Sequence, residues 1–174
     1  GKALTVMKGL MEAQGEIAVF TDMDQATPIN QIEKFLPKFE LDYDIVIGSR
    51  HGRKGAPALR KLTAWGFAFL RNIILGLPFS DTQCGFKAFN KASRVTVFKK
   101  MKDNWEKSRA SGAAVNAGFD VEALFLAKKL GFKIFEVPVD WHYVGTKRVN
   151  LIKDSLEAVK DMMRIRWNDL TGKY

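Results

Sequence analysis

The order of short apolar segments and amphipathic segments is the feature that most constrains the fold of this chain of 174 residues. Two runs, EIAVF at 16–20 and YDIVIGSR at 43–50, are typical of short buried strands. Segments whose apolar residues recur at helical spacing lie around them, for example at 2–14 and 58–75. Strands that alternate with helices predict an α/β domain with helices flanking a layered sheet.

The remaining segments continue this alternation. Thr27 and Pro28 are a good N-cap and first-turn pair, so we expect a helix from there to Phe35, which Pro37 keeps from extending. In order, the further expectations are a helix over 91–101, a mostly irregular connection over 102–118, a helix over 119–130 closed by Gly131, a strand region over 132–143 broken at Pro138, and a last helix over 151–167 with Ile152, Leu156, Val159 and Met163 on one stripe.

Charge and composition limit the partners and the chemistry. Lys and Arg outnumber Asp and Glu by 28 to 19, and the net charge of +9 favours anionic partners such as nucleotide phosphates, nucleic acid or lipid headgroups. The positive residues are scattered without an aromatic–basic pattern for stacking bases, which argues against nucleic acid. One cysteine and two histidines exclude a disulfide framework and a zinc-type cluster, so any metal must be bound by oxygen atoms.

The sequence has neither the pattern of a transmembrane helix nor that of a signal peptide. Its most apolar stretch, 62–79, is interrupted by Arg71, Asn72 and Pro78. The chain begins GKALTVMKGL without an initiator methionine, and we expect it to be the interior of a longer protein.

Two aspartates follow the strand expected at 16–20. Side chains at i and i+2 of an extended backbone point the same way, so Asp22 and Asp24 would face one spot. Like charges held close repel each other unless a cation lies between them, and Mg²⁺ or Mn²⁺ suits carboxylate oxygens. A polar turn closing the strand is the alternative. Because Ser49 and Arg50 also follow a strand, and ligands of open α/β sheets lie at the carboxyl ends of strands, this convergence favours the metal site.

Five blocks carry a resemblance that runs over nearly the whole chain: TDMDQATPI, IGSRHGRKGAPALRK, SDTQCGFKAFN, FDVEALFLAKKLGFKIFEVPVDW and VGTKRVN. With these blocks the chain resembles the family-2 inverting glycosyltransferases of GT-A fold, in particular the dolichyl-phosphate β-glucosyltransferases and bacterial polyprenyl-phosphate glycosyltransferases. The resemblance implies a GT-A-like layered sheet with flanking helices. Residues 1–174 would form one partial catalytic domain, the later two thirds of the family domain, without its first strand–helix–strand units.

The resemblance also implies a reaction. A sugar, with glucose from UDP-glucose as the first choice, would be moved with inversion from a nucleotide sugar to a polyprenyl or dolichyl phosphate, assisted by Mg²⁺ or Mn²⁺. Two alternatives stay open: GDP-mannose as the donor, and an inactive basic fragment that only binds. A homo-oligomer is also left open.

The resemblance assigns roles to several charged residues. Asp22 and Asp24 would bind the metal. Arg50, Arg60 and Ser49 would grip the acceptor phosphate, and a guanidinium suits this task because it binds two phosphate oxygens at once. A basic loop, with Lys147 and Arg148 as its charged residues, would close over the donor pyrophosphate. The competing interpretation of each basic residue is a solvated surface side chain.

Three further acids are candidates for catalysis. Asp120 and Glu122 open a helix in the FDVE block, where the resemblance places a catalytic base. Both could instead serve the helix N-terminus, which favours carboxylates. Asp81, in the DTQCGFK block, would orient the sugar or the acceptor loop.

The helix expected over 58–75 bears on membrane binding. Arg60 and Arg71 are almost three full turns apart and share a face, and most of the remaining circumference is apolar. This helix would lie partly in a membrane interface or be buried in the domain. We expect a peripheral protein of the cell envelope, at the cytoplasmic, inner face of a membrane.

Overall fold

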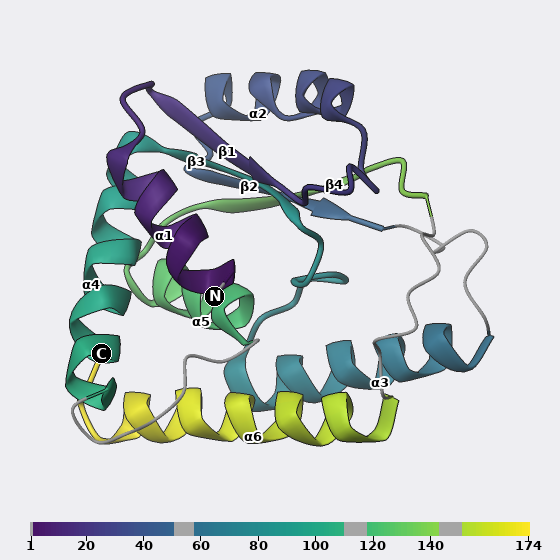
Figure 1. The fold of residues 1–174 in the computed structure, drawn as a ribbon, viewed down its shortest axis with the longest axis vertical. Coiled ribbons are helices and arrows are strands. Elements are labelled where there is room, and N and C mark those ends of the chain that lie inside the picture. Colours follow the sequence, from purple (N-terminus) through teal and green to yellow (C-terminus); the bar gives the residue numbers. More distant parts are fainter. Residues whose placement is uncertain (1, 51–57, 110–117, 143–150) are drawn as a thin grey trace.

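The computed structural model describes the backbone of residues 2–50, 58–109, 118–142 and 151–174, and the side chains of 2–50, 62–105, 118–142 and 155–174 (Figure 1). In chain order the helices and strands are α1 (Lys2–Glu12), β1 (Ile17–Thr21), the 3₁₀ helix η1 (Ile29–Lys34), α2 (Leu36–Glu40), β2 (Ile45–Ser49), α3 (Ala58–Leu75), β3 (Phe86–Asn90), α4 (Lys91–Arg109), α5 (Phe119–Lys129), β4 (Ile134–Pro138) and α6 (Leu151–Leu170).

Over the described residues the strands form a four-stranded sheet in the order β1-β3-β2-β4. Strand β2 runs parallel to β4, whereas β3 runs antiparallel to its neighbours β1 and β2. The register pairs Thr21 with Phe86 and Ser49 with Pro138. Because β3 is reversed, its first residues lie at the same edge of the sheet as the last residues of β1, β2 and β4. Pro138 is tolerated there because β4 is an edge strand.

Helices cover both faces of the sheet (Figure 1). On one face lie η1 and α2, and Phe35 between them packs edge-on against Phe86 with ring centroids 5.1 Å apart. On the other face lie α1, α4 and α5 (Figure 1). Helices α3 and α6 pack against each other and form an outer layer beyond α5 (Figure 1).

Helix α5 occupies the centre of the larger core. Every residue from Phe119 to Ala127 is buried, which fits a segment that is apolar on nearly all sides. The core around it combines buried side chains of α1, α4, β1 and β2, among them Met7, Phe98 and Ile47. Burial of this helix fixes the position of Asp120 and Glu122 in its first turn.

The helix expected from Thr27 and Pro28 to Phe35 is confirmed only as a 3₁₀ helix, and the expected stop before Pro37 is wrong. The chain instead forms η1 over Ile29–Lys34 and then α2 over Leu36–Glu40, with the buried Phe35 between them. Pro37 lies in the first turn of α2 rather than after the end of a helix. The first turn tolerates proline because its N–H would have no helical partner, so the residue begins a helix here.

The expected end of the helix at residue 101 is also wrong, since α4 continues to Arg109. Trp105 is buried against the core and its indole Nε1 donates a hydrogen bond to Glu122 Oε2 of α5, at 3.2 Å. This packing outweighs the weak helix propensity of Asp103 and Asn104. The rest of the connection expected over 102–118 lies mostly outside the described residues.

No helix in the described part of the chain is long and apolar enough to cross a membrane.

Candidate active site

Two of the residues predicted from strand ends, together with one loop, meet at a single edge of the sheet. Asp22 follows β1, Arg50 follows β2, and the loop Ser80–Gly85 leads into β3. The backbone N–H of Asp22 donates a hydrogen bond to Gly85 O at 3.0 Å, and the N–H of Arg50 donates one to Asp81 Oδ2 at 3.2 Å. The edge therefore joins a carboxylate and a guanidinium through one loop, as the strand-end argument predicted.

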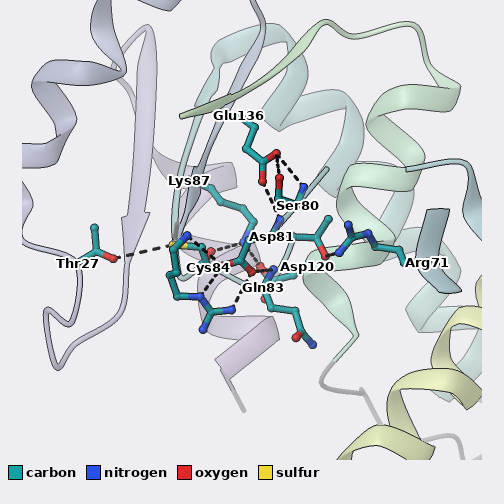
Figure 2. Close-up of polar contacts among 11 residues, drawn as sticks. Thr27, Arg71, Ser80, Asp81, Gln83, Cys84, Lys87, Asp120 and Glu136 are labelled. Carbon is teal, nitrogen blue, oxygen red and sulfur yellow. Dashed lines mark hydrogen bonds and ion pairs between the residues drawn. The ribbon is translucent and has the colours of Figure 1, made fainter. Parts of the chain in front are cut away.

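The loop Ser80–Gly85 is attached to β4 and to α3 (Figure 2). Glu136 of β4 accepts hydrogen bonds from Ser80 N at 2.8 Å, from Ser80 Oγ at 3.1 Å and from Asp81 N at 2.7 Å. Arg71 of α3 donates from Nη1 to Thr82 Oγ1 at 3.0 Å and from Nη2 to the carbonyl of Phe79. These bonds hold the loop in one conformation at the edge.

Asp81 orients Arg50 rather than standing alone. The guanidinium donates from Nε to Oδ2 at 2.5 Å and from Nη2 to Oδ1 at 2.8 Å, which is the two-bond pairing of arginine with carboxylate. The ring centroid of Trp141 lies 5.7 Å from the guanidinium carbon, within the range of a cation–π contact. Burial lowers the pKa of Arg50, but the hydrogen bonds and charge of Asp81, with a contribution from Asp22, raise this pKa above its ordinary value. The guanidinium thus keeps its charge although its side chain is only 18% exposed.

Asp22 lies in a space that Gly85 leaves open. A Cβ atom at Gly85 would come within 1.9 Å of Asp22 Oδ2, so only glycine permits the carboxylate to occupy this place. The ammonium of Lys2, at the start of α1, donates to Asp22 Oδ1 at 2.5 Å. Asp24 is exposed in the turn that follows, and its Oδ1 accepts a hydrogen bond from Ala26 N at 3.1 Å.

Asp22 and Asp24 lie in a turn, closed by the hydrogen bond from Gln25 N to Asp22 O at 3.1 Å, and not in the extended segment that would aim both carboxylates at one spot. Asp22 already attracts one cation, the ammonium of Lys2. Within the described residues, however, no group of three or more His, Cys, Asp and Glu side chains could hold a metal ion. Mg²⁺ is typically bound by one or two carboxylates plus substrate phosphates and water, and this donor set matches that pattern better than an all-protein metal site.

Asp120 forms a buried ion pair below the loop. Lys87 Nζ of β3 donates to Asp120 Oδ1 at 2.8 Å and to the carbonyl of Cys84 in the loop (Figure 2). Both side chains are almost entirely buried. The pair therefore connects α5 to the loop, and Asp120 has its charge compensated by Lys87.

Glu122 is placed away from the loop, in a network with three donors. Its carboxylate accepts hydrogen bonds from Trp105 Nε1 at 3.2 Å, from Arg164 Nη2 at 3.3 Å and from Tyr174 Oη at 2.7 Å. These bonds join α4, α6 and the last residue of the sequence to α5. This environment favours a structural role for Glu122 over that of a catalytic base.

The other predicted site residues differ in how far the structure describes them. Ser49 is buried at the end of β2, and its carbonyl accepts a hydrogen bond from Val139 N at 3.0 Å. Arg60 lies in the first turn of α3, and its side chain is outside the described residues. Lys147 and Arg148 also fall outside them.

Sequence reasoning missed several residues that shape this edge. It gave Arg71 a helix face shared with Arg60, whereas Arg71 is buried and bound to the loop, and burial lowers its pKa. The signal available for Lys87 was a charged residue inside an apolar strand. Nothing in the sequence marked Glu136 as the partner of Ser80, because their contact depends on how the strands are ordered.

The sequence matches the family described as glycosyl transferase family 2 over residues 1–98, more than half of the chain. Dolichyl-phosphate beta-glucosyltransferase of Dictyostelium discoideum is 30% identical over 99% of this chain and 52% of its own length. The human protein of the same name is 28% identical over 100% of this chain and 54% of its own length. Glycosyltransferase AglD of Haloferax volcanii is 28% identical over 96% of this chain and 26% of its own length.

The chain belongs to glycosyltransferase family 2. This confirms the resemblance found in the sequence, and the layered α/β sheet is consistent with the expected GT-A-like fold. The chain spans about half the length of the dolichyl-phosphate beta-glucosyltransferases that it matches.

Proposed function

We propose that this chain is the catalytic part of a hexosyltransferase that moves glucose from UDP-glucose to a polyprenyl or dolichyl phosphate, with inversion at C1 of the sugar. The observation that carries the proposal is that Asp22 and Arg50 lie at one edge of the sheet, where Asp81 holds the guanidinium of Arg50 by two hydrogen bonds. A carboxylate suits the cation of a nucleotide diphosphate, and a guanidinium suits the phosphate of an acceptor. The names of the family relatives support the choice of donor sugar and lipid.

On the donor side, Asp22 and Asp24 would hold Mg²⁺ or Mn²⁺. When bound, this ion neutralises the negative charge of the departing diphosphate. Lys147 and Arg148 are proposed to contact the same pyrophosphate. Lys2 is a further candidate for this side, because its ammonium already lies at the Asp22 carboxylate.

On the acceptor side, Arg50 would position the lipid phosphate, with Arg60 and Ser49 as further candidates. Contacts with Asp81 and Trp141 restrict the guanidinium, which reduces the freedom lost when the phosphate binds. A phosphate oxygen attacks C1 of glucose, the bond from C1 to the diphosphate oxygen breaks, and UDP leaves. Attack opposite the leaving group inverts the configuration at C1.

This reaction needs no protein group to remove a proton, since the acceptor phosphate is already ionised near neutral pH. We therefore propose that Asp81 and Asp120 act by positioning. Asp81 holds Arg50, and Asp120 holds Lys87, which binds the loop carbonyl of Cys84. Glu122 is assigned to the packing of α5.

The test is transfer of sugar-labelled UDP-glucose to a polyprenyl phosphate in detergent micelles with Mg²⁺. We expect label in the lipid extract, carried by a β-glucosyl phosphate, and little label from GDP-mannose. Arg50→Lys should lower transfer roughly tenfold or more, because lysine keeps the charge but not the two-bond fork. Preferred use of GDP-mannose would replace the proposed donor, and metal-dependent UDP binding without any transfer would favour the binding fragment.

A further inference from the structure

Exposed large apolar side chains gather on the outer helix pair. Of the fifteen such side chains found among the described residues, nine belong to α3 or α6. Single exposed apolar residues are ordinary, whereas a group of them on neighbouring helices indicates an interaction surface.

Helix α3 carries its exposed apolar residues on one stripe. Leu62, Trp65, Phe69 and Ile73 follow each other at spacings of three and four residues, and all four are exposed. The rings of Trp65 and Phe69 stack with centroids 5.8 Å apart. The buried residues Arg71 and Leu75 lie on the opposite side of the helix. This stripe therefore points away from the body of the protein.

Helix α6 has a similar stripe, formed by Leu156, Lys160, Met163, Trp167 and Leu170. Its four apolar members are all exposed. The residues of α6 that face the core are different ones, with Met162 and Ile165 buried. The apolar stripe predicted from the sequence for this helix includes Leu156 and Met163. The structure shows that both of these residues are on the exposed side of α6.

The two stripes belong to the same outer layer. Helices α3 and α6 pack against each other, and both begin on the side of the molecule at which β2 and β4 end (Figure 1). We call these two stripes together the α3–α6 face. Arg71 connects this face to the site, because it lies on the inner side of α3 and binds Thr82 of the loop and the carbonyl of Phe79 just before it.

The charges of this layer suit an anionic surface. Helix α3 carries Arg60 and Lys61 in its first turn and no acidic residue, and Lys160 lies within the stripe of α6. The acidic residues of α6 fall outside that stripe at helical spacing: Asp154, Glu157, Asp161 and Asp169. The chain as a whole carries a net charge of +9. Tryptophan, which combines an apolar ring with an N–H donor, is typical of the membrane–water interface, and the stripes contribute one each, Trp65 and Trp167.

We infer that the α3–α6 face rests on the headgroup region of a bilayer containing anionic lipids, with its apolar side chains reaching the acyl boundary. The choice of lipid over a second copy of the chain rests on the proposed function, because a polyprenyl acceptor is held in a bilayer. The positive charges support the same choice, since two copies would bring like charges together.

The experiment is cosedimentation of the chain with vesicles of equal parts phosphatidylcholine and phosphatidylglycerol, without any polyprenyl phosphate. Leu62→Gln/Leu170→Gln should weaken binding roughly tenfold, because two apolar side chains are lost from the interface. The matched control is Leu36→Gln/Leu41→Gln, in and next to α2 on the far side of the sheet, and it should bind as the parent does. Leu62 and Leu41 are equally exposed, at 64% each.

Two further measurements separate the outcomes. Trp65→Gln/Trp167→Gln should remove most of the blue shift in tryptophan fluorescence that vesicles produce, while circular dichroism stays that of the parent. Equal vesicle binding by parent, face and control variants would overturn the inference. The inference would also be overturned if the parent bound no vesicles and instead formed a dimer, detected by sedimentation, that the face variants do not form. None of these measurements involves a sugar donor. A parent chain that binds vesicles but transfers no glucose would therefore count against the proposed function alone.

Discussion

Gly85 and Asp22 depend on each other at the candidate site. The carboxylate of Asp22 occupies the volume that any larger residue at position 85 would fill. The atoms that a new Cβ would meet belong to the tip of a flexible side chain and not to the backbone. The fold can therefore accept a methyl group at position 85 by turning Asp22 away, and the site cannot.

We expect Gly85→Ala to weaken Mn²⁺-dependent binding of UDP about tenfold or more while leaving the thermal midpoint nearly unchanged. The reason is that Asp22 must leave its position and its contact with Lys2. Electron paramagnetic resonance of free Mn²⁺ in the presence of UDP measures the binding, and circular dichroism measures the midpoint.

Gly9→Ala on the exposed side of α1 is the matched control, because a Cβ at Gly9 meets nothing within 4 Å. It should keep metal-dependent binding, and the midpoint should rise slightly, since alanine favours a helix. Undiminished binding by Gly85→Ala would show that Asp22 does not act from its present position.

The residues whose chemistry could be read from the sequence are those next to strand ends. Asp22 and Arg50 were placed at one edge by that argument, and the structure brings them there. The partner of each residue could not be predicted. Asp81 pairs with Arg50 across 31 positions, and Glu136 binds Ser80 across 56, because the order of strands in the sheet decides these contacts.

For the elements with a strong local pattern, most of the predicted ends lie within about two residues of the observed ones. Strand β1 and helix α5 are examples. The reversed direction of β3 has no local signal, since a buried strand has the same composition in either direction. The extension of α4 was missed because it depends on packing of Trp105 against α5, a tertiary contact.

Helix α5 also gives a prediction about alkaline stability. Tyr174 donates a hydrogen bond to Glu122 in the first turn of this helix. Burial, followed by the charge of Glu122, raises the pKa of Tyr174 well above its ordinary value of 10.0. Burial likewise raises the pKa of Cys84 above its ordinary value of 9.0. Because the native state disfavours both ionised forms, their contribution to stability is full below these ordinary values and is lost as the pH rises above them.

Urea unfolding at about pH 7.5 and about pH 10.5 checks this expectation. The free energy of unfolding of the parent should fall between the two conditions. Tyr174→Phe should be less stable than the parent near neutral pH, because Glu122 loses a donor, and should lose less stability on going to the higher pH. An equal fall in parent and variant would contradict the role given to Tyr174.

At the scale of the whole molecule, the sheet edge and the α3–α6 face serve two ends of one proposed reaction. The edge offers carboxylates and a guanidinium to a charged donor and acceptor, and the face offers apolar and basic side chains to the membrane that holds the acceptor. Arg71 links them by binding the loop from α3. Sequence periodicity showed that α3 is apolar over most of its surface, but only the structure shows which side is exposed beside α6.

The most direct measurement of the central claim is calorimetric titration of the chain with UDP-glucose, with and without Mn²⁺. We predict binding that requires the metal and that falls about tenfold or more in Asp24→Asn, because one of the two carboxylates is lost. Asp42→Asn, an exposed carboxylate before β2 at the opposite edge of the sheet, should bind as the parent does. Binding that is independent of Mn²⁺ and equal in parent, Asp24→Asn and Asp42→Asn would contradict the account.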